Sequence, residues 1–229
     1  LTQGFHWQCD YIFTLDNEGK TGSLKSWITL SNNSGTRYQN AKLSFLAGEV
    51  NRVPIENPRP GMPGARSRAV TASDGSIWGQ VIGEYHLYKV PFTVTIPDKS
   101  IKQVSLMEKS GIQAGRELVF DLRRYKGAPR NAYPVPFLSI KPNFVITVKN
   151  DEANQLGVAL PKGVFKVFQH DQEGQAQLLG EDAIVHTPRN ETLRINAGKA
   201  FDVVADYLQL DYKYIDNNRE IGSIATYQV

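Results

Sequence analysis

The chain has 229 residues, of which 41% are hydrophobic and 21% charged, and its formal net charge is +3. These proportions are those of a globular protein rather than a disordered one, and the length suffices for one large or two small β-domains. Because no Lys/Arg run concentrates the positive charge, we expect no nucleic-acid-binding surface. No window approaches the roughly 18 apolar residues of a transmembrane helix, so we expect a chain that does not span a membrane.

The first run, 5–15, alternates apolar and polar residues and predicts a strand. Its apolar face is made of Trp7, Cys9, Tyr11 and Phe13. Cys9 is the only cysteine, so it forms no disulfide within the chain, and we expect it to act as a small buried apolar side chain. The second run, 24–31, is followed by an Asn-Asn-Ser-Gly turn at 32–35.

The remaining runs continue with the same period of two. They cover 42–53, 84–96, 101–108, 116–124, 137–149, 163–169, 175–181, 191–196, 200–215 and 223–229. The clearest hairpin is 164–179, where the reversal is Asp-Gln-Glu-Gly. No run combines helical periodicity with caps. The sequence therefore predicts an all-β protein with β-sandwich-like or barrel-like antiparallel sheets and long loops.

Two segments rich in Pro and Gly interrupt the strands. Residues 54–80 predict a long surface loop, and 125–136 an extended connection. The connection suggests two β-subdomains, 1–125 and 137–229; strands exchanged between the sheets of a single domain fit the pattern equally well.

Few residues suggest chemistry. The best cluster for a divalent cation or for acid–base catalysis is Glu181, Asp182 and His186, with His170 across the preceding hairpin. However, Glu181 and Asp182 are adjacent, so on a strand they face opposite ways. The common enzyme signatures are absent. We therefore assign no catalytic residue and no cofactor, and interpret the cluster as a charged turn.

Aromatic residues offer the other functional signal, because a flat platform of exposed rings can stack on a carbohydrate. Trp7 and Trp27 lie in alternating runs and are expected in the core. Trp78 lies in a Gly-rich part of the long loop and is the candidate ligand-binding residue.

Four segments in a fixed order resemble one family. They are Trp7-Gln8-Cys9-Asp10-Tyr11, the stretch 24–51, Glu84-Tyr85-His86-Leu87-Tyr88, and 180–204, from Gly180-Glu181-Asp182 to Phe201-Asp202-Val203-Val204. Together they resemble the bacterial domain of unknown function that forms the C-terminal part of mucoidy-inhibitor-A-like proteins. The resemblance implies a β-sandwich-type fold and export to the periplasm or the outside, and it supplies no activity, cofactor or site residue. It also implies that the chain is cut inside the domain, which would leave its last strand exposed or completed by another segment.

We accordingly expect a bacterial envelope module that acts by protein interaction or scaffolding, by strand addition at an exposed sheet edge. The first alternative is a carbohydrate-binding module, and the second a metal-dependent hydrolase.

Overall fold

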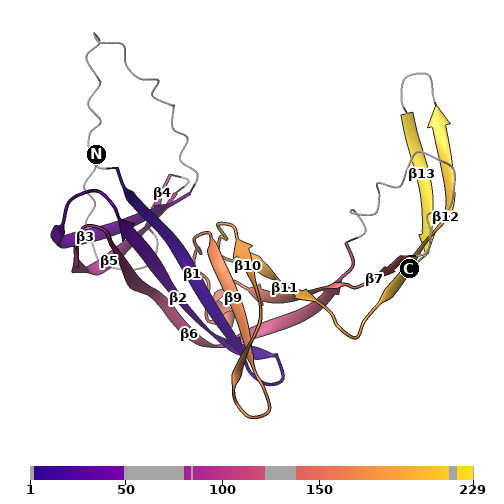
Figure 1. Cartoon of the computed structure of the whole chain (residues 1–229), viewed down its shortest axis with the longest axis horizontal. Helices are drawn as coiled ribbons and strands as arrows, with labels where there is room; N and C mark the ends of the chain where they lie inside the picture. The colour runs from indigo at the N-terminus through magenta and orange to yellow at the C-terminus, as the bar shows by residue number, and fades with distance from the viewer. Residues whose placement is uncertain (1–2, 49–79, 84, 122–137, 217–220, 229) are drawn as a thin grey trace, which may run out of the picture.

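The computed structural model describes residues 3–48, 80–83, 85–121, 138–216 and 221–228 (Figure 1). The predicted loop 54–80, apart from Gln80, lies outside the described residues, and so do Trp78 and the connection 125–136.

The all-β prediction is confirmed, and the one helical turn among the described residues is the 3-10 turn η2, Glu152–Asn154. The strands of the N-terminal half are β1 Phe5–Leu15, β2 Thr21–Asn32, β3 Tyr38–Ala47, β4 Gln80–Ile82, β5 Tyr85–Ile96 and β6 Ser100–Val119. Those of the C-terminal half are β7 Leu138–Ile140, β8 Asn143–Lys149, β9 Gly163–His170, β10 Ala176–Ile184, β11 Thr192–Lys199, β12 Ala205–Asp216 and β13 Ile221–Gln228. Strand β6 is one element where the alternation suggested two, because it continues through Gly111, whose φ of +73° suits glycine.

The largest sheet has seven strands in the order β10-β9-β1-β2-β6-β8-β11. All its neighbours are antiparallel except β1 and β9, which run parallel from Cys9 to Leu15 and so differ from the all-antiparallel expectation. Gly163 permits this pairing, because a Cβ at that position would lie 2.0 Å from the Cys9 carbonyl oxygen. The sheet contains strands from both sides of the 125–136 connection. The pairing of β1 with β9 and of β6 with β8 joins the two predicted halves in this one sheet.

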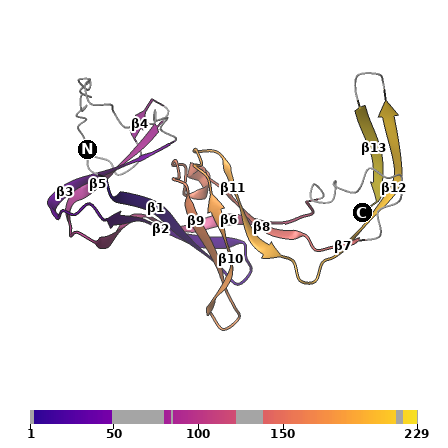
Figure 2. The ribbon, with the colours of Figure 1, turned by 45° about the horizontal axis from the view of Figure 1, so that its top comes forward.

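The seven-stranded sheet curls until its outer strands, β10 and β11, meet and nearly close a barrel (Figure 2). At the seam, Asp182 accepts a hydrogen bond from the Asn196 backbone N–H, 2.8 Å away. Beside it, a Cβ on Gly180 would lie 2.3 Å from the Ala197 carbonyl oxygen. Both strands carry a bulge here, and such bulges bend strands where a barrel closes.

The barrel interior is a packed apolar core. The inward face of β1 supplies Cys9, Tyr11, Phe13 and Leu15, all at most 1% exposed. Tyr11 stacks on Phe165 of β9, with ring centroids 5.4 Å apart. The alternation of β1 therefore assigned Cys9, Tyr11 and Phe13 to the correct face.

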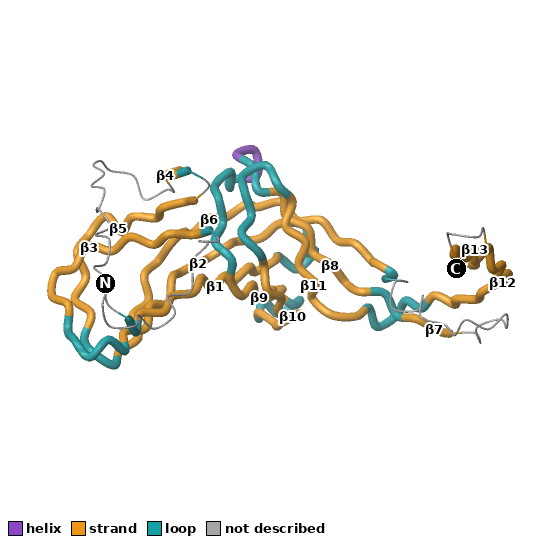
Figure 3. Tube along the Cα trace, turned by 90° about the horizontal axis from the view of Figure 1, so that it is seen from above, coloured by secondary structure: helices purple, strands orange, loops and turns teal. Residues whose placement is uncertain are grey.

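A second sheet, in the order β3-β5-β4, packs against the start of β1 (Figure 3). Two aromatic pairs join the layers: Trp7 with Phe45 at 5.4 Å, and Phe5 with Tyr38 at 5.2 Å. Buried Asn32 connects two turns at the same end of the molecule, because its side-chain amide donates hydrogen bonds to the carbonyls of Thr36 and Pro97. The sequence marked Asn32 as a turn residue, and here it joins two turns.

The third sheet, β13-β12-β7, lies at the end of the molecule opposite β3 and β5 (Figures 1 and 3). Among the described residues, no helix has the length and apolar character needed to cross a membrane.

The seam generates a stability prediction. Gly180→Ala places a methyl group against the Ala197 carbonyl and should lower the free energy of unfolding by about 1–3 kcal/mol, through overpacking. Urea denaturation measures this loss. The control Leu178→Ala changes an exposed side chain on the same strand and should cost well under 1 kcal/mol. Equal stability of Gly180→Ala and the parent protein would contradict the close approach of β10 to β11.

The buried thiol generates a pH prediction. Burial raises the pKa of Cys9 from 9.0 to about 12. Between these values the unfolded chain loses a proton that the folded chain keeps, so stability should fall by up to about 1.4 kcal/mol per pH unit as pH rises above 9. Below pH 9 both states hold the proton, and the Cys9 contribution stays constant.

Urea denaturation at pH 8, 9 and 10 tests this slope. Burial also raises the pKa of Tyr11 and Tyr88, whose contributions begin above pH 10 and have the same sign. The variant Cys9→Ala should therefore have a flatter profile between pH 9 and 10. An identical slope in both proteins would show that Cys9 is not the titrating group.

Candidate functional site

The structure separates the four residues considered as candidates for a metal site, Glu181, Asp182, His186 and His170. His170 is exposed at the end of β9, and exposed Glu181 pairs with Lys166 across the strands at 3.9 Å. Asp182 lies at the seam and His186 follows β10 at the barrel mouth. In the part of the chain that the structure describes, no three His, Cys, Asp or Glu side chains gather where they could hold a metal ion.

Asp182 has a structural role at the seam. One carboxylate oxygen accepts from the Asn196 N–H and the other accepts from the Ala183 N–H, at 2.8 and 2.9 Å. The carboxylate thus supplies an acceptor where β10 and β11 have no regular ladder. Asp182 and Glu181 are neighbours on β10, and they face opposite ways, as the alternation of a strand predicts.

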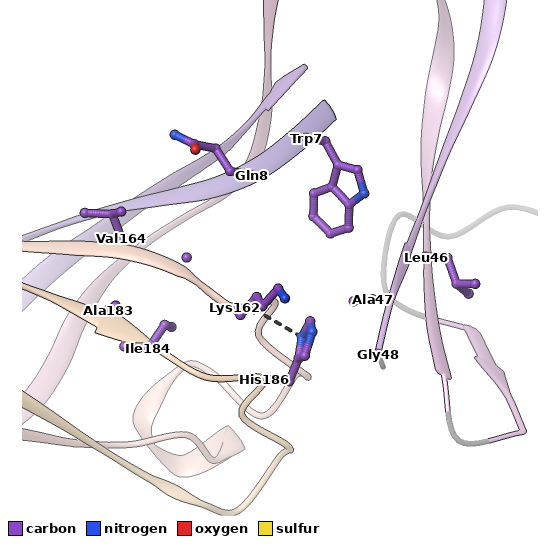
Figure 4. Close-up of a pocket in the computed structure, with 11 residues that line it drawn as sticks. Trp7, Gln8, Leu46, Ala47, Gly48, Lys162, Val164, Ala183, Ile184 and His186 are labelled. Carbon is purple, nitrogen blue, oxygen red and sulfur yellow. Dashed lines mark hydrogen bonds between the residues drawn. The ribbon is translucent and has the colours of Figure 1, made fainter. Parts of the chain in front are cut away.

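His186 is held in one orientation by a backbone hydrogen bond. Its Nδ1 accepts from the Lys162 N–H at 3.1 Å (Figure 4). An accepting Nδ1 carries no proton, so the neutral imidazole has its proton on Nε2. His186 thereby links the start of β9 to the segment after β10.

A cavity of about 420 Å³ opens beside this histidine. The indole of Trp7 forms one side, while Lys162 and His186 form the other (Figure 4). The end of β3 adds a third wall. The lining residues are Trp7, Gln8, Leu46, Ala47, Gly48, Lys162, Gly163, Val164, Ala183, Ile184 and His186.

A second cavity of about 190 Å³ adjoins the first and shares Ala47, Gly48 and His186 with it. It adds His86 and Tyr88 from β5 and the segments 159–160 and 187–188. We call the two cavities together the mouth groove. It lies at the mouth of the barrel, between the second sheet and the loop after β10, and barrel mouths are a common place for binding sites.

The floor of the mouth groove is fixed by buried polar groups. The hydroxyls of Tyr11 and Tyr88 donate to the carbonyls of Pro161 and Ala159, each at 2.7 Å. Burial raises the pKa of both hydroxyls, so they remain protonated donors. Leu160 and Thr187 exchange two backbone hydrogen bonds of 2.8 and 2.9 Å. These bonds fix the segment 159–161 beside the smaller cavity.

Buried Asn150 supports the same region from below. Its amide nitrogen donates to the carbonyls of Val158 and Pro188, at 2.6 and 2.8 Å. Its amide oxygen accepts from the Gly157 N–H. One side chain thus positions both segments that border the smaller cavity.

The lining of the mouth groove is apolar with a basic edge. Its charged or titratable members are Lys162, His86, His186 and Tyr88, and no Asp or Glu of the described residues belongs to the lining. Among the carboxylates of neighbouring strands, Asp10 and Asp182 accept hydrogen bonds from Thr29 and Asn196 respectively, and Glu181 pairs with Lys166. The groove therefore suits a ligand that is apolar and carries negative charge.

Sequence reasoning missed Trp7 as a site residue. Trp7 was expected in the core, and it packs against Phe45 there, but it is only partly buried and lines the cavity. Its position near the start of β1, where the barrel opens, was the available signal. Trp78, the predicted ligand-binding residue, lies outside the described residues.

Comparisons with family models, with curated proteins and with solved structures find no match to this chain. The site is therefore interpreted from its own residues, and the family resemblance remains a prediction.

The role of Asp182 can be tested by its removal. Asp182→Ala takes away the acceptor of the Asn196 N–H and should cost about 1–2 kcal/mol of unfolding free energy. Amide exchange at Asn196 should accelerate, as followed by NMR. The control Glu181→Ala removes an exposed carboxylate from the neighbouring position and should change stability by less than 0.5 kcal/mol or so. A larger loss from Glu181→Ala than from Asp182→Ala would contradict the seam assignment.

Proposed function

We propose that this chain is an extracytoplasmic bacterial envelope module that binds or scaffolds a partner protein, and that the mouth groove receives an extended segment of that partner. The observation that carries the proposal is the meeting of a groove and a sheet edge at the same place. Export and the envelope location come from the family resemblance and are part of the proposal.

Strand β3 provides the edge. In the described sheet its one neighbour is β5, and an edge strand directs half of its backbone N–H and C=O groups away from that neighbour. Leu46 and Ala47 at the end of β3, together with Gly48 after it, also form a wall of the mouth groove. An extended segment added to β3 would therefore bring its side chains to the groove.

The two halves of β3 differ as templates. Register shifts interrupt its pairing between Tyr38 and Ala41 and again between Lys42 and Ser44. From Ser44 to Ala47 the pairing is regular, and this part carries no charge. Bulges and lysines are features that protect sheet edges from pairing. The unprotected part is the one beside the groove.

Less supports the alternatives. A carbohydrate platform needs two or more coplanar exposed rings, and of the exposed phenylalanines in the described part Phe92 lies on β5 and Phe201 in the connection between β11 and β12. A hydrolase would need the predicted residues to converge, whereas His170, Asp182 and His186 lie at different places.

A peptide library with no chosen sequence tests the proposal. Phage that display random 12-residue peptides are selected on the folded chain, and each selected peptide is synthesised. We expect the bound peptide to slow hydrogen exchange in 44–48 and 183–186. Trp7→Leu should weaken binding about tenfold, while the control Phe92→Leu, at an exposed ring on β5, should leave it unchanged.

Two results would contradict the proposal: the absence of any peptide that protects 44–48, and equal weakening by both variants. If Trp7→Leu does not fold, the hydrogen-exchange pattern of the parent protein with a bound peptide still tests the proposal, because it shows whether residues 44–48 are protected.

A further inference from the structure

We infer that the mouth groove recognises an acidic, apolar segment in which a carboxylate lies two residues from an apolar side chain. This inference rests on the proposed function and adds the chemistry of the partner. It follows from the composition of the lining, the state of the surrounding carboxylates and the period of an added strand.

The apolar requirement comes from the walls. Trp7, Leu46, Ala47, Val164 and Ile184 surround the larger cavity, whose volume of about 420 Å³ lies in the range of ordinary ligand sites. Burial of an aliphatic or aromatic side chain against such a surface contributes about 25 cal/mol per Å² of apolar area removed from water. A purely polar segment would leave this surface unused.

The acidic requirement comes from Lys162. Its backbone N–H is bound to His186, whereas its side chain is exposed and forms no ion pair within the described residues. Within the described part of the chain, the lining offers it no carboxylate. An incoming carboxylate would therefore meet an ammonium group at the edge of an apolar surface, where the interaction is stronger than in open water.

The neighbouring acidic side chains of the described residues form their printed contacts with groups other than Lys162. Asp182 accepts from the N–H groups of Asn196 and Ala183, and Asp10 accepts from Thr29 and Gln8. Glu181 pairs with Lys166. The positive edge of the groove is thus left for a partner.

The spacing follows from the strand. Side chains at positions i and i+2 of an extended segment point to the same side. If the segment pairs with the end of β3, two such side chains face the groove together. One of these side chains contacts the apolar wall and the other contacts Lys162. The segment therefore carries an acidic and an apolar residue separated by one residue, in either order. An anionic oligosaccharide would match the charge and could stack on one indole, but it cannot continue the backbone pairing of β3.

Fluorescein-labelled peptides test the inference. The probe is Thr-Thr-Glu-Thr-Phe-Thr-Thr, and its twins replace Glu by Gln or by Lys. Fluorescence anisotropy at low salt should give an affinity for the Glu peptide about two- to fivefold above that for the Gln twin, and the Lys twin should bind more weakly than the Gln twin. Raising the salt concentration should narrow the difference, because the charges are near the surface.

A charge reversal on the protein completes the test. Lys162→Glu should invert the preference, so that the Lys twin binds best. The matched control Lys102→Glu reverses an exposed lysine on β6 outside the groove and should leave the order unchanged. Both positions are exposed, so neither variant should affect folding.

The outcomes separate the inference from the proposed function. If library peptides protect 44–48 but the Glu and Gln probes bind equally, or Lys162→Glu changes nothing, the acidic chemistry is wrong and the groove function stands. If no peptide of either kind protects 44–48, the groove function fails first. Displacement of a selected peptide by an anionic oligosaccharide, with no exchange protection of β3, would overturn both.

Discussion

The structure depends on the closure of a seven-stranded sheet whose outer strands cannot pair along a regular ladder. Closure demands that β10 and β11 approach within contact distance, and Gly180 makes this possible because any side chain would meet the Ala197 carbonyl. Asp182 then satisfies the Asn196 N–H, which would otherwise lose a partner. The missing Cβ of Gly180 and the carboxylate of Asp182, two residues later on the same strand, therefore allow β10 and β11 to meet.

The same closure creates the mouth groove. A barrel of this size is filled by its own side chains, so space remains only where strands begin or end. Trp7 and the start of β9 lie at that rim, and the second sheet stops short of the loop after β10. The bordering segments are held by Tyr11, Tyr88 and Asn150, which satisfy the backbone carbonyls beneath them. The polar side chains bond to the backbone segments that border the groove, and the apolar side chains line its cavity. This arrangement makes the groove suited to binding.

Local pattern predicted the strands and their faces, as in β1, where the alternation assigned Cys9, Tyr11 and Phe13 to the core. It also predicted that Glu181 and Asp182 face opposite ways. It could not predict the parallel pairing of β1 with β9, because Tyr11 and Phe165 are separated by more than half of the chain. The groove is harder still, since it combines the start of β1, the end of β3 and the segments around Lys162 and His186. A periodicity of two says which side of a strand is buried, but it does not say where a barrel opens.

The edge of β3 connects stability with binding. A free edge is a hazard for any β protein, and β3 limits it with irregular pairing and Lys42 along its first part. The last part, from Ser44 to Ala47, pairs regularly with β5 and lacks such protection. Leaving that part unprotected is costly unless pairing there is confined to suitable segments. A groove that is apolar, with Lys162 at its margin, imposes this limit, because a basic or purely polar segment would gain the backbone pairing and little else. The residues that give the groove its chemistry thereby restrict which chains can use the edge.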